Sequence, residues 1–266
     1  MNMLHISAYK FVQFDSTELF TLQKELRTQA AEYSLKGTIL LSEEGANFCL
    51  AGLPDSVQNF KNYLQSIKKF ANLTFKESTS DQQPYKKLLV KIKKEIITLG
   101  MPHLSSQTAP YVTPQQLKEL YEEQCDMVML DTRNNYEVQM GTFEGALQLD
   151  IKNFQEFPQA LAQLPEELKQ KTIVTFCTGG IRCEKAVLVM QQQGFKNVYQ
   201  LQGGILNYFK ESGDAFYEGD CFVFDERLVL DSHLQSRLIA QCIRCRNPLK
   251  CNDNHDAAEQ CLQCSG

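Results

Sequence analysis

Residues 172–183 read T-I-V-T-F-C-T-G-G-I-R-C, an apolar run that ends at Cys177 and leads through two glycines into a helical pattern. From Tyr111 onward, short apolar segments of this kind alternate with helical segments. Continuous apolar strands that alternate with helices predict a parallel sheet with helices on both faces. Ligands of such sheets bind beyond the carboxyl ends of the strands, and Cys177 lies at such an end.

The residues around Cys177 favour an ionised thiol. Two glycines let backbone N–H groups turn inward as a nest for an anion, and the N-terminus of the next helix adds positive potential. Arg182 adds a permanent cation, so the Cys177 thiolate is expected to be nucleophilic near neutral pH. A buried inert cysteine is the alternative, but the glycines and the arginine together favour function. The active-site loop is expected to include Thr178, Gly179, Gly180, Ile181 and Cys183.

The loop length also bears on the chemistry. Cys177 and Arg182 are spaced C-x4-R, whereas the phosphate-sized nest of protein tyrosine phosphatases needs the longer C-x5-R. The shorter loop favours sulfur chemistry over phosphate hydrolysis. Cys183 has two interpretations: it resolves a persulfide or sulfenate on Cys177, or it faces the core in the first helical turn. We favour the second.

The first hundred residues predict a separate α/β unit in the order βαββαβ, which is the ferredoxin-like (acylphosphatase-like) arrangement. Two capping-box spacings, Asp15 with Glu18 and Asp55 with Gln58, predict where its helices begin. A further alternating strand follows at 87–96. The predicted organisation is a ferredoxin-like domain at 1–99, a linker at 100–112, a parallel-sheet domain at 113–214 and a C-terminal extension at 215–266.

Composition narrows the class of protein. The chain has 266 residues and 43% hydrophobic residues, and it contains no apolar run of 18 residues, so no membrane span is expected. No signal peptide is apparent at the start, and a cytoplasmic location is expected. Its ten cysteines are therefore expected to be reduced. Scattered Cys49, Cys125 and Cys221 are expected to be small buried residues.

Charge is unevenly distributed along the chain. Residues 1–100 carry 13 basic and 10 acidic side chains, whereas residues 101–266 carry 14 and 22. Nine lysines lie between Lys61 and Lys94 against Glu77 and Asp81. Such a patch can attract phosphate backbones, but on charge alone a solvated lysine face is the favoured interpretation.

The cysteines of the tail have metal-site spacing. Two C-x2-C pairs fifteen residues apart are the pattern of a four-cysteine zinc site. We expect any zinc there to be structural; a tail without metal is the alternative. The expected ligands are Cys242, Cys245, Cys261 and Cys264, with Cys251 and His255 as further candidates.

Longer motifs carry a family resemblance. The run L-D-T-R-N-N-Y-E-V-Q-M-G-T-F-E-G-A at 130–146, followed by C-T-G-G-I-R-C, resembles a rhodanese domain. With G-F-K-N-V-Y-Q-L-Q-G-G-I, F-V-F-D-E-R and K-G-T-I-L-L-S-E-E-G, it resembles the TrhO (YceA-like) family of oxygen-dependent tRNA uridine hydroxylases over nearly the whole chain. The resemblance implies that the wobble uridine becomes 5-hydroxyuridine, with molecular oxygen as co-substrate and tRNA as partner.

The resemblance assigns roles by position. Cys177 matches the catalytic cysteine, which carries a persulfide or adduct, and Arg182 matches the loop arginine. Asp131 and Arg133 match a supporting D-x-R pair; we favour a structural role, with Asp131 bonding backbone groups and Arg133 pairing with Glu137 or another acid.

One position departs from the family pattern. The family usually reads E-G-I-N-G-T near the first hairpin, whereas this chain reads E-G-A-N-F-C at 44–49. Phe48 could stack on a base if that hairpin touches RNA, but an ordinary strand aromatic is the favoured interpretation.

Three functions compete. The first is tRNA uridine hydroxylation through Cys177, although no flavin, haem or 2-His-1-carboxylate pattern shows how oxygen is activated. The second is sulfurtransfer, in which Cys177 passes persulfide sulfur from thiosulfate or a protein donor. The third is a non-enzymatic RNA-binding module, which the intact Cys177–Arg182 loop argues against. A basic first domain and a cysteine-rich tail favour the first.

Overall fold

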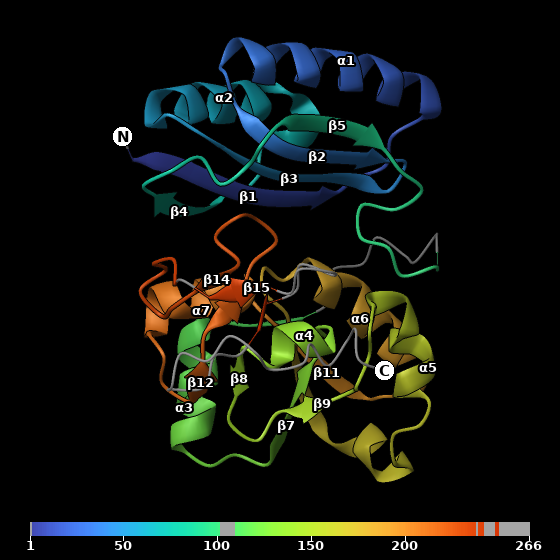
Figure 1. The fold of residues 1–266 in the computed structure, drawn as a ribbon. Helices are drawn as coiled ribbons and strands as arrows, with labels where there is room; N and C mark the ends of the chain where they lie inside the picture. Colours follow the sequence, from blue (N-terminus) through green and yellow to red (C-terminus); the bar gives the residue numbers. More distant parts are fainter. Residues whose placement is uncertain (1, 102–109, 238, 242–247, 250–266) are drawn as a thin grey trace. The chain divides into compact units, whose positions relative to one another are not determined.

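The computed structural model describes residues 2–101, 110–237, 239–241 and 248–249 (Figure 1). The chain divides into two compact units, Met1–Thr108 and Ala109–Gly266. The predicted Cys-rich zinc site lies outside the described residues.

The first unit is built on a five-stranded sheet in the order β4-β1-β3-β2-β5. Its first four strands pair antiparallel, and β5 is added parallel to β2. This order is that of the predicted ferredoxin-like arrangement with the extra strand at one edge. The strands are β1 (Met3–Phe11), β2 (Lys36–Ser42), β3 (Gly45–Gly52), β4 (Lys76–Ser80) and β5 (Leu88–Ile92).

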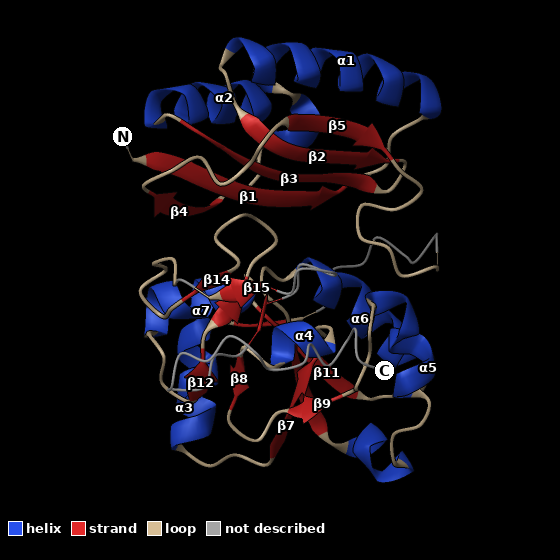
Figure 2. Cartoon of the chain, in the orientation of Figure 1, coloured by secondary structure: helices blue, strands red, loops and turns tan. Residues whose placement is uncertain are grey.

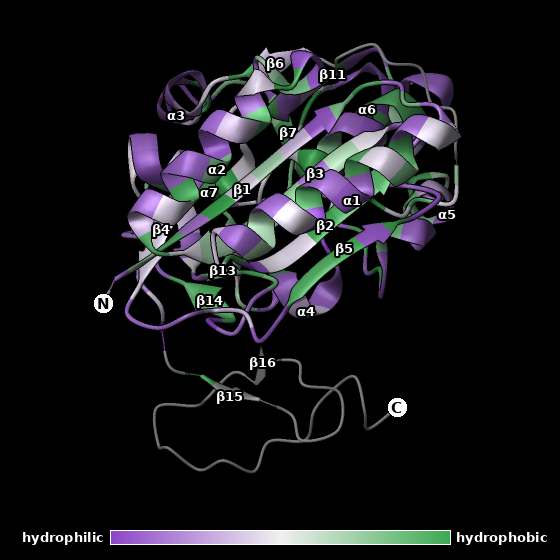
Figure 3. Ribbon diagram, turned by 90° about the horizontal axis from the view of Figure 1, so that it is seen from above, coloured by the Kyte–Doolittle hydropathy of each residue, from purple (hydrophilic) through white to green (hydrophobic). Residues whose placement is uncertain are grey.

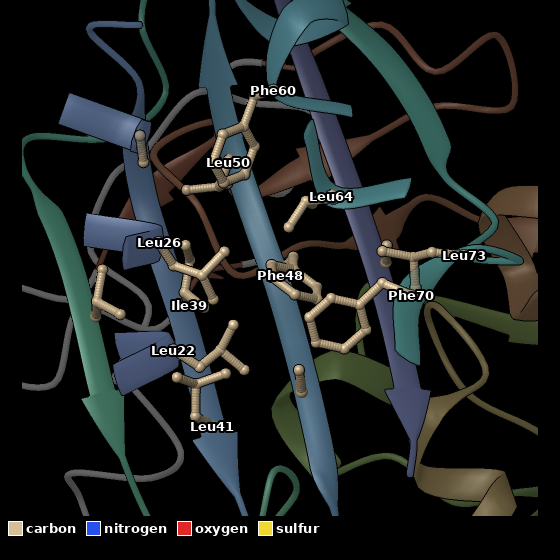
Figure 4. Packing of buried hydrophobic residues seen from close by; sticks show 14 of the residues in the cluster. Leu22, Leu26, Ile39, Leu41, Phe48, Leu50, Phe60, Leu64, Phe70 and Leu73 are labelled. Carbon is tan, nitrogen blue, oxygen red and sulfur yellow. The ribbon is translucent and has the colours of Figure 1, made fainter. Parts of the chain in front are cut away.

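Helices α1 (Ser16–Glu32) and α2 (Pro54–Ser66) cover one face of this sheet, and the one-turn 3-10 helix η1 (Lys68–Phe70) follows α2 (Figure 1). Helix α1 alternates between purple and paler or green segments in Figure 3, as an amphipathic helix does. Phe48 of β3 is fully buried and packs edge-to-face on Phe70 at 5.4 Å (Figure 4). The interpretation of Phe48 as an ordinary strand aromatic is therefore confirmed.

The two predicted helix starts had different outcomes. Asp15 caps α1, because its Oδ1 accepts the Glu18 N–H at 2.7 Å. The second prediction was wrong, because α2 begins at Pro54 after Leu53 and has no side-chain cap. Proline is favoured in the first helical turn, where its missing N–H costs nothing, and it set the start one residue before Asp55.

The second unit is built on a five-stranded, fully parallel sheet in the order β6-β11-β10-β7-β9. Helix α3 packs against α7, and α5 packs against α6; the two pairs lie on opposite sides of the strands (Figures 1 and 2). The predicted parallel sheet with helices on both faces is therefore confirmed. The sheet strands are β6 (Tyr111–Val112), β7 (Met127–Asp131), β9 (Leu147–Gln148), β10 (Thr172–Phe176) and β11 (Asn197–Leu201).

The remaining elements of this unit are short. Its helices are α3 (Pro114–Glu122), α4 (Asn135–Val138), η2 (Phe154–Glu156), α5 (Phe157–Leu161), η3 (Glu166–Gln170), α6 (Ile181–Gln192) and α7 (Gly204–Ser212). Its small antiparallel pairs are β8 (Gly141–Phe143) with β12 (Tyr217–Gly219), β13 (Cys221–Phe222) with β14 (Val229–Leu230), and β15 (Ala240–Gln241) with β16 (Pro248–Leu249). Among the helices of the described residues, none is long and apolar enough to cross a membrane.

Candidate active site

Cys177 follows directly on the central strand β10, and helix α6 begins four residues later. The parallel neighbour β7 ends at the same edge, because Phe176 and Asp131 are register partners. The site thus lies at the carboxyl ends of the strands, where parallel sheets bind ligands.

The loop wraps the sulfur of Cys177 with backbone donors. The Gly180 N–H donates to the Cys177 Sγ at 3.0 Å. Gly180 has φ of 90°, a left-handed conformation that glycine adopts without strain. The backbone N–H groups of Arg182 and Cys183, at the start of α6, also lower the pKa of this thiol. The predicted anion nest is thus present, and it is centred on the sulfur atom itself.

Opposing effects set the pKa of Cys177. Burial alone would raise the pKa of this thiol, since Cys177 is almost fully covered. The Cys183 hydrogen bond, the Arg182 charge and the backbone N–H donors outweigh burial and lower the pKa of Cys177 below its ordinary value. The same contact and burial raise the pKa of Cys183, which stays a thiol and donates to the thiolate. Cys183 therefore faces the core, as favoured from the sequence, and its thiol also contacts the Cys177 sulfur.

Arg182 is held by Glu137, a residue that sequence analysis offered only as a partner for Arg133. Nη1 and Nη2 of Arg182 donate to the two carboxylate oxygens of Glu137 at 2.6 Å each, and both side chains are buried. Glu137 also accepts the Asn134 N–H at 3.1 Å and the Thr178 hydroxyl at 3.4 Å. The carboxylate thus fixes the loop arginine and one loop side chain at the same time.

Asp131 and Arg133 pair with each other. Nε and Nη2 of Arg133 donate to the Asp131 carboxylate at 2.9 and 2.7 Å, and Thr142 Oγ1 donates to it at 2.8 Å. Of the expected partners of Arg133, Glu137 or another acid, the structure shows another acid, Asp131, because Glu137 pairs with Arg182. Asp131 also accepts the backbone N–H of Arg133 at 3.0 Å, as expected for a structural role. The hydroxyl oxygen of Thr132, the middle residue of the D-x-R segment, lies 3.7 Å from the Cys183 sulfur. Through this contact, the D-x-R segment supports the loop that carries Cys177.

A second glycine pair supports the loop from behind, and sequence analysis did not assign it a role. Gly203 and Gly204 both have positive φ, 75° and 70°, where β11 turns into α7. A Cβ on Gly204 would lie 2.4 Å from the Cys177 carbonyl oxygen and 2.7 Å from the Gly180 nitrogen. Behind it, the Ile205 N–H donates to that Cys177 carbonyl at 3.0 Å. Its signal was present in the sequence as a second strand end followed by Gly-Gly.

The C-terminal extension also reaches the loop. The Thr178 hydroxyl, whose one hydrogen is shared with Glu137, also faces the Phe222 carbonyl oxygen at 3.3 Å. Phe224, two residues on, lies 5.7 Å from the Arg182 guanidinium carbon, measured to the ring centre. F-V-F-D-E-R carried part of the family resemblance, but nothing in its pattern placed it at the site.

The scattered cysteines differ from one another. Cys221 is buried as expected, and burial raises its pKa to about 12. Cys49 is only half-buried. The expectation for Cys125 was wrong, because Cys125 is exposed in the turn after α3, next to the left-handed residue Gln124. Among the described residues, no group of three or more His, Cys, Asp or Glu side chains could hold a metal ion.

Comparison with known proteins follows the two units. Residues 3–96 match the UPF0176 acylphosphatase-like domain, and residues 113–211 match the rhodanese-like domain. A tRNA uridine(34) hydroxylase of Cupriavidus necator is 48% identical over 253 residues, which cover 92% of this chain and 89% of that protein. The chain belongs to the tRNA uridine(34) hydroxylase family.

Two further relatives agree with this membership. Family members with the same name from Ralstonia nicotianae and Bordetella petrii are 43% and 47% identical. The first match covers 100% of this chain and 97% of that protein, and the second covers 87% and 94%. The resemblance drawn from the motifs is therefore confirmed over both units.

Solved structures give weaker likenesses. The rhodanese-like domain of an Anabaena protein covers 41% of this chain and 79% of its own, with 24% identity and a TM-score of 0.35. A human single-domain sulfurtransferase covers 39% and 98%, with 22% identity and a TM-score of 0.34. The rhodanese assignment rests on the sequence match and on the sheet described above.

Proposed function

We propose that this protein hydroxylates uridine 34 of tRNA, with Cys177 as the catalytic residue. The observation that carries the proposal is the match to proteins named tRNA uridine(34) hydroxylase at 43–48% identity across both units. The loop geometry supports it, because a thiolate that accepts the Gly180 N–H and whose pKa the Arg182 charge lowers is suited to nucleophilic attack.

The proposed role of the thiolate is addition to C6 of the uracil ring. The new S–C6 bond uses the thiolate electron pair, and the electrons of the C5–C6 double bond move to C5 and the O4 carbonyl. The electron-rich C5 then receives oxygen; loss of the C5 proton and of the thiolate restores the ring. With dioxygen as oxidant, the second oxygen atom leaves as water, which requires two electrons and two protons from an external reductant.

The burial of Cys177 constrains the substrate. Its side chain is 1% exposed, so a uracil that remains stacked in RNA cannot reach the sulfur. Enzymes that act on a base take it out of its stack. The target base therefore has to leave its stack, which costs least in a single-stranded loop such as the anticodon loop.

The lysines of the first unit supply the proposed phosphate contacts. Lys61 is paired with Glu77 and Lys69 with Glu18, so these two add little net charge. We infer that exposed lysines just before, on and after β5 attract the RNA backbone. They are Lys87, Lys91, Lys93 and Lys94.

The reaction is tested in cells that lack this gene. Their tRNA is digested to nucleosides and analysed by mass spectrometry after expression of the protein or of an empty vector. We expect 5-hydroxyuridine derivatives to return in cells that express the protein and not in cells that carry the empty vector. If they do not return, while purified protein transfers sulfur from thiosulfate to cyanide, the chain is a sulfurtransferase that acts through a Cys177 persulfide.

A further inference from the structure

Phe224 is an exposed aromatic side chain next to the active-site loop. Its side chain is 60% exposed, which is unfavourable for a phenyl ring. Its ring centre lies 5.7 Å from the guanidinium carbon of Arg182, which is within cation–π range. The ring of Phe224 therefore contacts Arg182 of the loop and still has most of its surface exposed to solvent.

Hydrogen bonds fix the turn that carries Phe224. The Val223 N–H donates to the Leu228 carbonyl at 2.7 Å, and the Leu228 N–H donates to the Asp225 carbonyl at 3.0 Å. Within the turn, Nε and Nη2 of Arg227 donate to the Asp225 carboxylate at 2.8 and 2.6 Å. This pair repeats the arrangement of Asp131 and Arg133, so the exposed ring is carried by a turn with many internal bonds.

The ring itself is also supported from one side. Phe222 packs edge-to-face on Phe224 with ring centres 5.1 Å apart and an interplanar angle of 89°. Phe222 in turn packs edge-to-face on Tyr136 of α4, at 5.2 Å. A chain of three aromatic rings thus runs from the α4 segment, which carries Glu137, to the open ring of Phe224.

We propose that Phe224 stacks on the target uracil and holds it beside Arg182 for attack by Cys177. An unstacked base loses its neighbours in the RNA, and aromatic side chains commonly replace them. The inference rests on the proposed tRNA substrate, and it adds a substrate-binding residue from the C-terminal extension to the rhodanese loop.

Binding measurements test the stacking directly. Full-length wild type, Phe224→Ala, Phe224→Leu and Phe224→Tyr are titrated into two fluorescent anticodon stem-loops, one with uridine and one with an abasic nucleotide at position 34. The alanine and leucine variants are expected to bind the uridine hairpin about tenfold more weakly than wild type. Phe224→Tyr is expected to bind like wild type, and all four proteins are expected to bind the abasic hairpin equally.

The outcomes separate stacking from structure and from catalysis. If Phe224→Leu binds the uridine hairpin like wild type, or if Phe224→Ala weakens both hairpins equally, the ring does not stack on base 34. Wild type that binds the two hairpins equally, or binds neither, also overturns the inference. If Phe224→Ala fails to fold, the comparison of leucine with tyrosine still decides. Because the readout is affinity, absence of 5-hydroxyuridine in cells would contradict the hydroxylase proposal and leave this result standing.

Discussion

Arg182 and Glu137 form a buried ion pair with two hydrogen bonds of 2.6 Å, although 45 positions separate them in the sequence. The pair joins the loop that carries Cys177, after β10, to helix α4, after β7. The positive charge of Arg182 also lowers the pKa of Cys177. By holding the guanidinium in place, the Glu137 carboxylate therefore fixes the position of a charge that stabilises the thiolate.

Removal of this carboxylate is predicted to destabilise the second unit. In Glu137→Ala the guanidinium of Arg182 stays buried without its partner, which typically costs roughly 3–5 kcal/mol of unfolding free energy. Urea-induced unfolding measures the loss. Glu119→Ala, at an exposed position of α3, is the matched control and is expected to change stability by less than about 0.5 kcal/mol. Equal stability of the two variants would contradict the role of the pair.

The Cys177 thiolate is predicted to persist below the pH at which a free cysteine is protonated, about 8.5. A lowered pKa means that the anion dominates at neutral pH and is lost only as the pH falls through the lowered value. Thiolate absorbance in the ultraviolet, taken as the difference between wild type and Cys177→Ser, follows this titration without requiring a reagent to reach the buried sulfur.

Cys183 is predicted to be part of this effect. Cys183→Ala removes the side-chain hydrogen bond to the thiolate, so the titration of Cys177 is expected to move to higher pH. Cys125→Ala, which changes an exposed residue, is expected to leave the titration unchanged. A Cys183→Ala titration that coincides with wild type would mean that the backbone donors and Arg182 are sufficient.

Replacement of Gly204 by alanine is predicted to destabilise the protein, because Gly204 packs directly on the loop that carries Cys177. Alanine there meets the strain of positive φ, about 1–2 kcal/mol, and a collision with the Cys177 carbonyl that adds roughly 1–3 kcal/mol. Gly145→Ala is a matched control, because Gly145 has a similar φ of 67° and no atom within 4 Å of an added Cβ. Differential scanning calorimetry on both variants isolates the collision; equal melting temperatures would show that the loop yields.

The cysteine-rich tail stays a prediction from the sequence. One zinc ion per full-length chain is expected by metal analysis after purification without chelator. Cys245→Ser and Cys261→Ser are expected to lose it, whereas Cys125→Ser keeps it. Separate Cys251→Ser and His255→Ala variants show whether either is a ligand. Metal-free wild type after zinc addition and dialysis would contradict the site.

The sequence was sufficient for features that depend on neighbouring residues. Alternation of apolar and helical segments predicted the parallel sheet, and the Gly-Gly-x-Arg spacing predicted the nest around Cys177. The missed features depend on contacts between distant segments. Glu137 stood in a quoted motif, but nothing local indicated that it holds Arg182 rather than Arg133.

Gly204 and Phe224 were missed for related reasons. The role of Gly204 follows from the atoms of another loop that lie where its Cβ would be. The exposure of Phe224 follows from a turn whose hydrogen bonds, apart from the D-x-R spacing, leave no pattern in the sequence. Packing between segments far apart in the sequence also determines that the side chain of Phe48 lies on the buried face of its strand.

The most direct test of the central claim replaces the sulfur of Cys177. Cells that lack this gene express wild type, Cys177→Ser or Cys125→Ser at levels matched by immunoblot, and their tRNA nucleosides are analysed by mass spectrometry. Wild type and Cys125→Ser are predicted to restore 5-hydroxyuridine derivatives, and Cys177→Ser is predicted to restore none. Full restoration by Cys177→Ser would contradict the claim that this sulfur carries the reaction.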